Sequence, residues 1–284
     1  MIVVVGADQP LGRAAVDQLT ANGQAHRRLD LGTPAAPDGA EAQAAADSAA
    51  ARIERTVVDE AIFDGADGVL IAPAPGGTGA EDGGAGLLTG LIDQAGAAGV
   101  GRVVYFSIVA AQLSPIAFHA RIEEHLRNSR IDHTVLRVAL SLEAFQPLIR
   151  HAAQTGELPA PAGAARFAAA PRADYAAAGL AALTPGIAGP QGELTAASAF
   201  DLTELAAAVA AATGKPVRRT DSDDETVLAA LAAQGVPTPS AGALLSLIKL
   251  GERGAFEAVS PHLRVLLAGP GTELTAAVRA VLAG

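Results

Sequence analysis

The sequence predicts an α/β protein built on a doubly wound parallel sheet, and three observations lead to that class. Short apolar runs of strand length alternate with longer segments of helical periodicity. The first apolar run breaks at Gly6 into a tight loop that leads directly into a helical pattern. The length of 284 residues suffices for one large α/β domain, or for such a domain with an appended lobe.

The start of the chain reads as a strand, a loop and a helix. Residues 1–5 are apolar, and a helical face resumes at Leu11. A loop of this kind directs backbone N–H groups and the positive end of the helix toward a phosphate. Gly6 and Gly12 stand where the first and last glycines of a dinucleotide-binding loop belong, whereas Gln9 takes the middle place. A side chain there is expected to crowd a pyrophosphate.

The second predicted strand, residues 25–31, carries charges that bear on cofactor choice. Asp30 lies roughly 20 residues beyond the glycine loop, where an acid binds the adenosine ribose of NAD. Arg27 and Arg28 equally favour the 2′-phosphate of NADP. The residues alone therefore leave NAD and NADP open.

Helices and strands then continue in alternation, as a doubly wound sheet requires. The pattern predicts helices over residues 38–52, 87–98 and 116–126, and strands over residues 56–59, 67–73, 102–107 and 134–138. Glu123 and Glu124 are expected on the exposed face of their helix. Beyond Phe145 the connections become longer and rich in Ala, Pro and Gly.

This change in composition and in the length of the connections predicts a domain boundary near residue 145. Residues 1–145 form the expected dinucleotide-binding domain, and residues 146–284 form a smaller, mostly helical lobe, with part of the chain near 164–200 returning to the sheet. Asp201 and Glu204 have capping-box spacing and open a helix that stops at Gly214. Acids at residues 221–225 precede the next helix, where the positive helix end favours them.

Composition excludes several classes of protein. A formal net charge of −10 with no basic cluster argues against direct nucleic-acid binding. No run approaches the ~20 apolar residues of a membrane span, and we expect the first residues to form a strand rather than a signal peptide. Cysteine is absent, which excludes disulfides and fits a cytoplasmic location. The histidines show no metal-ligand spacing, so no metal site is expected.

Several segments resemble the NmrA-like, atypical short-chain dehydrogenase/reductase family. Residues 99–107 (GVGRVVYFS) are similar to its GV-rVVylS segment, and residues 123–137 to its EE-LR-SGlDyTiLRP segment. Residues 172–176 and 204–217 resemble two further elements, and residues 228–271 resemble the C-terminal lobe of quinone-oxidoreductase-like members. The resemblance implies a Rossmann sheet that holds NAD(P)(H), with a smaller lobe over a substrate cleft.

The resemblance also implies roles for individual residues. Gly6, Gln9, Pro10, Leu11 and Gly12 would lie at the pyrophosphate, Arg27, Arg28 or Asp30 at the adenosine ribose, and Asp59 near the adenine. Ala72, Pro73 and Ala74 would flank the nicotinamide, with Ser107 at the floor of the cleft.

The chain departs from the wider superfamily at the catalytic pair. Pro115 and His119 occupy the places of a Tyr and a Lys that usually supply and tune the proton donor. A histidine at that place can orient a ribose hydroxyl or donate a proton near neutral pH. His119 and Ser107 are therefore the catalytic candidates. The alternatives are a surface or partly buried histidine with no catalytic role, and a serine that only hydrogen-bonds to a turn.

Three functions follow as expectations. The first is an NAD(P)H-dependent reductase of a small apolar quinone, enone or carbonyl compound, with NADP preferred over NAD. The second is a non-catalytic NAD(P)-sensing regulator, which the missing pair favours. The third is a redox-neutral biosynthetic enzyme, a cyclase, isomerase or lyase, which has abandoned the cofactor, as Gln9 suggests. Family analogy allows a homodimer.

Overall fold

A computed structural model describes residues 1–32, 60–74, 84–109, 111, 118–186, 189 and 191–284 of the chain. These residues form two compact units, Met1–Val138 with Tyr175–Glu193, and Ala139–Asp174 with Leu194–Gly284. The predicted helix at 38–52 and strand at 56–59 lie outside the described residues, as do Asp59 and Pro115. Whether the chain divides near residue 145 into two domains that fold independently stays a prediction.

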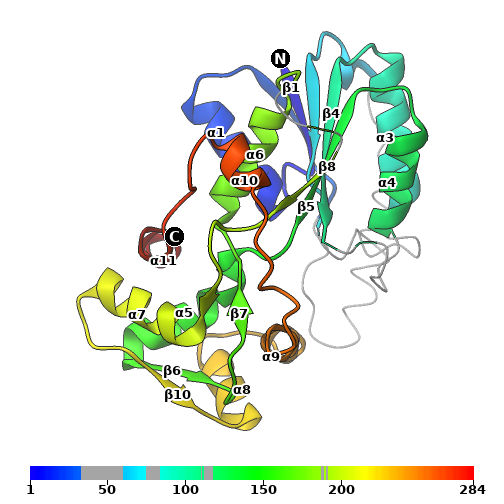
Figure 1. Ribbon diagram of the computed structural model, residues 1–284. Helices are drawn as coiled ribbons and strands as arrows, with labels where there is room; N and C mark the ends of the chain where they lie inside the picture. The colour runs from blue at the N-terminus through cyan, green and yellow to red at the C-terminus, as the bar shows by residue number, and fades with distance from the viewer. Residues whose placement is uncertain (33–59, 75–83, 110, 112–117, 187–188, 190) are drawn as a thin grey trace. The chain divides into compact units, whose positions relative to one another are not determined.

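The first unit is built on a six-stranded sheet with the order β2-β1-β3-β4-β5-β8 (Figure 1). The strands are β1 (Ile2–Val5), β2 (His26–Leu29), β3 (Gly68–Ile71), β4 (Arg102–Ile108), β5 (His133–Val138) and β8 (Gln191–Leu194). The ladders between β2 and β1, β1 and β3, β3 and β4, and β4 and β5 are all parallel. The predicted doubly wound sheet is confirmed.

Helices cover both faces of this sheet, as Figure 1 shows. Helices α3 (Ala85–Ala97) and α4 (Phe118–Asn128) pack on one face, and α1 (Pro10–Ala21) and α6 (Arg172–Ala182) on the other. The central strands β1, β3 and β4 are mostly apolar and buried, because strands covered on both faces have no solvent side. A short 3-10 turn, η1 (Glu60–Phe63), precedes β3.

Alternate residues of β4 meet different helices. Tyr105 packs in the cluster beneath α3 and α4, whereas Phe106 faces α6. A Cβ on Gly179 of α6 would lie 2.5 Å from the Phe106 ring, so glycine lets this helix approach the sheet. This alternation places Tyr105 and Ser107, two residues apart, on the face that α4 covers.

The second unit packs helices around two small sheets. Strands β6 (Glu157–Ala160) and β10 (Arg218–Asp221) pair in parallel, and β7 (Arg166–Phe167) and β9 (Phe200–Asp201) pair antiparallel. The helices are η3 (Leu142–Phe145), α5 (Gln146–Thr155), α7 (Leu202–Thr213), α8 (Asp224–Ala233), α9 (Thr238–Gly251), α10 (His262–Leu266) and α11 (Leu274–Ala283). The rings of Phe145, Phe167 and Phe200 contact one another in its core.

The helix caps of this unit follow the sequence pattern. Asp201 accepts hydrogen bonds from the amides of Thr203 and Glu204, and the Glu204 carboxylate accepts one from the Asp201 amide. The predicted capping box of α7 is therefore confirmed, as is the stop at Gly214, whose φ of +70° favours glycine. Asp223 caps α8 by accepting from the Thr226 amide.

Candidate functional site

The strand order places a topological switch point beside β1, which is where doubly wound sheets bind their ligands. From β1 the chain moves to β2 on one side, and it later returns to β3 on the other side of β1. The strand order therefore reverses at β1, and the loops that follow β1 and β3 lie side by side at the end of the sheet where ligands bind. The two loops meet closely: the Ala72 amide donates to the carbonyl of Val5 over 2.9 Å. A Cβ on Gly6 would lie 2.3 Å from the Ala72 carbonyl oxygen. The structure thus brings together the Gly6 loop and residues 72–74, as the predicted site requires.

The start of α1 has the properties of an anion site. Pro10 is the first helical residue, no side chain caps the helix, and its first turn holds no acid. Among the described residues, the Leu11 and Gly12 amides have no hydrogen-bond acceptor and Arg13, which is exposed, has no ionic partner. Free amides at a positive helix end beside a cation favour a phosphate. The donor set fits a dinucleotide pyrophosphate.

Gln9 sits at this loop without strain. Its backbone is extended, with φ −83° and ψ 156°, a conformation open to every residue type. The buried side chain donates from Nε2 to a carboxylate oxygen of Asp8 over 3.0 Å. The other Asp8 oxygen accepts from the Leu31 amide over 2.9 Å. The backbone therefore does not require a middle glycine here, and crowding of a pyrophosphate by Gln9 stays a prediction.

The charges at the end of β2 divide into two kinds. Arg27 donates from one guanidinium nitrogen to the carbonyls of Ala61, Ile62 and Asp64, and so holds η1 in place. Arg28 and Asp30 are both exposed, with a nitrogen and an oxygen 3.7 Å apart. Such an exposed pair is weak, so either side chain can turn to a ribose or its phosphate.

A buried polar cluster lies where β4 and β5 end beneath α4. Ser107 and Arg137 are register partners on the neighbouring strands. The Ser107 hydroxyl donates to Glu123 Oε1 over 2.6 Å, and Arg137 donates to both oxygens of the same carboxylate over 2.9 and 2.6 Å. The expectation that Glu123 lies on an exposed face is wrong: its side chain is 2% exposed, because two strand residues hold it. Glu124 is exposed as expected.

The Glu123 carboxyl is ionised by its partners. Burial alone would raise its pKa, but the hydrogen bonds from Arg137 and Ser107, with the charges of Arg137 and Arg127, lower the pKa below the ordinary range. An ionised carboxylate only accepts hydrogen bonds, so the Ser107 proton is directed at Glu123. Ser107 then offers only lone pairs to any further group.

His119 lies on α4 one turn before Glu123. Its Nδ1 is 2.6 Å from the Tyr105 hydroxyl oxygen, and its ring packs on Phe118 with the centroids 4.0 Å apart. Both His119 and Tyr105 are buried. Sequence reasoning missed Tyr105, Glu123 and Arg137 as members of this cluster. The available signal was spacing, since residues two apart on a strand and four apart on a helix share one face.

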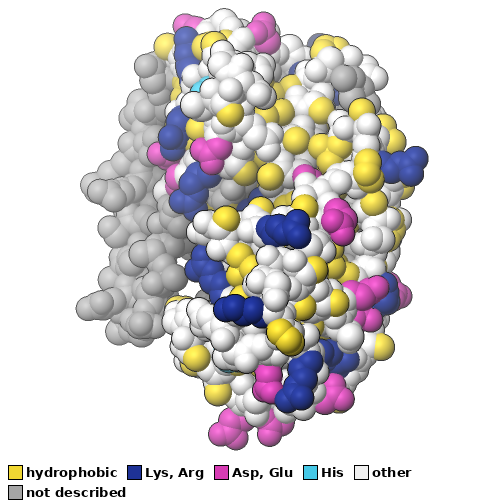
Figure 2. Space-filling model, turned by 90° about the vertical axis from the view of Figure 1, so that its left-hand side faces the viewer, with side chains coloured by type: hydrophobic (Ala, Val, Ile, Leu, Met, Phe, Trp, Pro, Cys, Tyr) yellow, Lys and Arg dark blue, Asp and Glu magenta, His cyan; other side chains and the backbone are white. Residues whose placement is uncertain are grey.

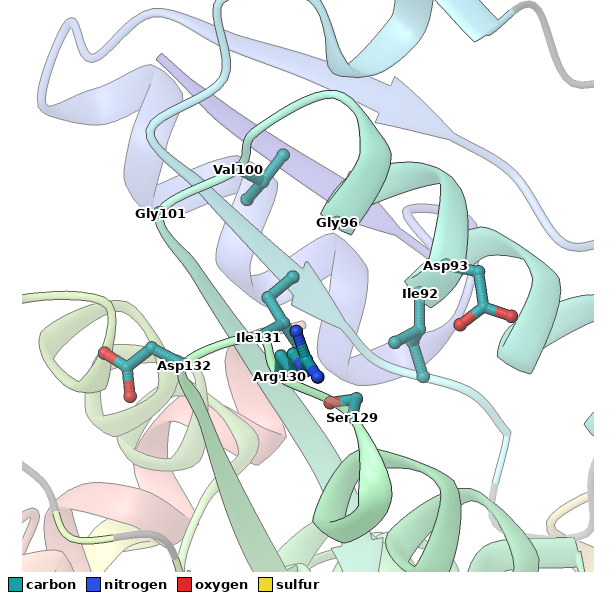
Figure 3. A pocket seen from close by; sticks show the side chains of 9 residues that line it. All are labelled: Ile92, Asp93, Gly96, Val100, Gly101, Ser129, Arg130, Ile131 and Asp132. Atoms are coloured by element: carbon teal, nitrogen blue, oxygen red, sulfur yellow. The ribbon is translucent and has the colours of Figure 1, made fainter.

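The sheet unit also has an open hollow at the other ends of the strands (Figure 3). Figure 3 shows Gly101 and Asp132 on its wall, and these residues directly precede β4 and β5. Ligands of doubly wound sheets bind at the opposite edge, where the strands end. The hollow contains none of the predicted site residues.

Metal and membrane sites are absent from the described part of the chain. No cluster of His, Asp and Glu there could hold a metal ion. None of the helices in that part has both the length and the apolarity to cross a bilayer. On the face in Figure 2, basic and acidic side chains are interspersed.

A doubly wound sheet with a glycine loop at its switch point defines the Rossmann class of α/β proteins. Comparison with known proteins narrows the class. The chain is 32% identical over 194 residues to quinone oxidoreductase 2 of Escherichia coli (strain K12), a match that covers 66% of this chain and 67% of that protein. No family model matches the chain.

Solved structures agree with this relationship. A crystal structure of an NADPH-dependent quinone oxidoreductase from Escherichia coli, complexed with NADPH, is similar with a TM-score of 0.72 and 26% identity, covering 99% of this chain and 100% of that one. The triphenylmethane reductase of Citrobacter sp. shares the fold, with a TM-score of 0.71 and 21% identity over 99% of each chain. The chain belongs to the NmrA-like, atypical short-chain dehydrogenase/reductase family.

Proposed function

We propose that this protein is an NADPH-dependent reductase of small quinone-like compounds. The observation that carries the proposal is the relationship to quinone oxidoreductase 2, which at 32% identity spans two thirds of both chains. The similar fold of the NADPH-complexed quinone oxidoreductase supports NADPH as the cofactor. The glycine loop at the switch point supplies the place for it in this chain.

The residues present fit the dinucleotide. The Leu11 and Gly12 amides and Arg13 would hold the pyrophosphate, because they offer donors and positive charge at the helix start. Arg28 would bind the 2′-phosphate, since Arg27 is engaged with the carbonyls at η1. Ala72, Pro73 and Ala74, beside Gly6, would flank the nicotinamide. When bound, the cofactor supplies the hydride.

The chain's own task is then to orient the acceptor and to stabilise the oxyanion that its reduction creates. Ser107 cannot readily release its proton, because that proton bridges to the ionised Glu123 carboxylate. His119 is the candidate donor instead: its ring N–H would hydrogen-bond to the acceptor oxygen, as a neutral imidazole can polarise a carbonyl, and water would supply the proton. A quinone needs only a weak acid, because its ring stabilises the reduced oxyanion. This chemistry suits a site in which Pro115 and His119 stand at the places of the Tyr and Lys.

The two alternative functions have different support. The hypothesis of a redox-neutral enzyme without a cofactor is based on Gln9. The loop backbone, however, accommodates Gln9 and leaves amides available for an anion. A sensor that binds NADPH without turnover differs from the reductase only in chemistry. Assay of turnover therefore separates the two.

The decisive experiment follows NADPH oxidation by the purified chain with a series of benzoquinones, naphthoquinones and enals. We expect the absorbance of NADPH to fall faster with quinones than with enals, and faster with NADPH than with NADH. Calorimetric titration of NADPH should give saturable binding without an acceptor. Tight binding without turnover on any acceptor would favour the sensor, and no binding at millimolar NADPH would leave the redox-neutral enzyme.

Arg28 tests the preference for NADPH. Arg28→Ala should weaken NADPH binding by about tenfold, because a phosphate loses a charge-assisted hydrogen bond worth roughly 1.5 kcal/mol. NADH lacks this phosphate, so its affinity should change less than twofold. Calorimetry with both nucleotides measures the ratio. Equal weakening for the two would show that Arg28 does not bind the 2′-phosphate.

A further inference from the structure

The hydrogen bond between Tyr105 and His119 fixes the imidazole in the interior of the sheet unit. Tyr105 is fully buried on β4, and His119 is 1% exposed on the helix that covers it. The Tyr105 oxygen and His119 Nδ1 are 2.6 Å apart, and the Phe118 ring packs on the imidazole with the ring centroids 4.0 Å apart. A ring held by a hydrogen bond and a neighbouring ring has little freedom to rotate.

The direction of this hydrogen bond follows from the phenol. Burial, with the nearby Glu123 charge, raises the pKa of Tyr105 well above its ordinary value, so the hydroxyl keeps its proton. A buried O–H needs an acceptor, and His119 Nδ1 is the one that the structure gives within the described residues. A neutral imidazole accepts at Nδ1 only when its proton is on Nε2.

We propose that Tyr105 is a positioning residue that locks His119 in the Nε2–H tautomer, so that Nε2 is the nitrogen from which the ring donates. Its importance for catalysis rests on the proposed function, in which the His119 ring N–H hydrogen-bonds to the acceptor oxygen. The two α4 contacts with β4 then assign opposite roles. Glu123 accepts a hydrogen bond from the Ser107 hydroxyl, whose oxygen can then only accept from a further group. His119 Nδ1 accepts a hydrogen bond from Tyr105, which leaves the Nε2–H of His119 as a donor.

Nuclear magnetic resonance tests the tautomer without any turnover. Long-range ¹H–¹⁵N correlation spectra of the ¹⁵N-labelled full chain at neutral pH show which nitrogen of each imidazole carries the proton. His119→Gln identifies the His119 signals among those of the six histidines. In the wild type we expect a protonated Nε2 and an unprotonated Nδ1. In Tyr105→Phe, which keeps the ring but loses the hydroxyl donor, the Nδ1–H form should become populated.

Tyr175→Phe is the matched control. Tyr175 is the chain's other tyrosine and is equally buried, but it belongs to α6 on the opposite face of the sheet. Its loss should leave the His119 tautomer unchanged. A wild-type His119 that carries its proton on Nδ1, or that is doubly protonated at neutral pH, would overturn the proposal. So would a tautomer that is the same in Tyr105→Phe as in the wild type.

Kinetics connects the tautomer to the reaction. Tyr105→Phe should lower kcat for quinone reduction roughly tenfold, about the value of one hydrogen bond to the acceptor oxygen, with the KM for NADPH unchanged. Tyr175→Phe should leave kcat within a factor of two of the wild type. Failure of the wild type to oxidise NADPH would refute the proposed function alone, since the spectra report the tautomer independently.

Discussion

Gly6 and Gly12 are both required to be glycine, but for different reasons. Gly6 has φ +79°, which side chains rarely adopt, and a Cβ there would also meet the Ala72 carbonyl. Gly12 lies within α1, and there a Cβ would stand 1.9 Å from the Gly6 carbonyl oxygen. Close packing of the first helix turn on the loop therefore explains the last glycine of the pattern, before any cofactor is considered.

Gly12→Ala should therefore lower the stability of the unit that contains the large sheet. The added methyl group meets backbone, which cannot rotate away, so we expect a loss of at least about 2 kcal/mol in the free energy of unfolding. Urea denaturation followed by circular dichroism measures it.

Gly90→Ala is the control for this substitution. Gly90 lies within α3, and a Cβ there meets no atom within 4 Å. Alanine should stabilise that helix by about 0.5–1 kcal/mol. Equal effects of the two substitutions would contradict the packing explanation.

Gln9 gives a second prediction at the residue scale. Because its backbone is unstrained and its side chain folds against Asp8, Gln9→Ala should change the NADPH dissociation constant by less than about threefold. Calorimetric titration measures the constant. Binding that becomes tenfold tighter would mean that the Gln9 side chain does crowd the pyrophosphate.

At the scale of elements, one carboxylate joins three of them. Glu123 of α4 accepts from Ser107 of β4 and from Arg137 of β5, so it fixes how the helix sits on the ends of these strands. The helix itself was predictable from its periodicity. The burial of Glu123 was not predictable, because a charged residue usually marks the solvent side of a helix and its two partners lie on strands far away in the sequence.

Glu123→Gln should lower the free energy of unfolding at neutral pH and reduce its dependence on pH. The folded state lowers the pKa of Glu123, so its contribution is complete above about pH 4.3, the ordinary value, and is lost as pH falls through the lower folded value. At pH 7 we expect a loss of roughly 2 kcal/mol, less than for a fully buried pair because Arg137 is partly exposed. Urea denaturation between pH 7 and pH 3 measures both effects.

The neighbouring acid is the control. Glu124→Gln removes the same charge from the exposed side of α4, and should change stability by less than about 0.5 kcal/mol. If Glu123→Gln lost as much stability below pH 4 as the wild type does, the ion pair would not be the source of the dependence.

At the scale of the whole molecule, the sequence places every predicted cofactor contact in the unit that contains the large sheet. NADPH should therefore slow hydrogen exchange most strongly at residues 7–13 and 28–32, where the loop and the end of β2 bind it. Mass spectrometry of peptides with and without NADPH measures this. Slowing confined to β6 and β10 of the other unit would contradict the assigned site.

The sequence by itself determined the alternation of strands and helices, the glycine loop and the caps of α7 and α8. These features depend on local rules, namely residue period, backbone conformation and side chains that bond to amides a few positions away. The family was inferred from several segments that resemble family segments and follow one another in the same order. The fold and the relationship to quinone oxidoreductase 2 confirm it.

Only the tertiary structure decided which polar groups are partners. Arg27 bonds to carbonyls more than 30 residues away, Glu123 to two strands, and His119 to Tyr105. Each side chain had several plausible roles in the sequence, because a charge or an imidazole is equally compatible with solvent, a ligand or a buried partner. Burial removes water as a competitor, and the sheet register then selects one partner by distance.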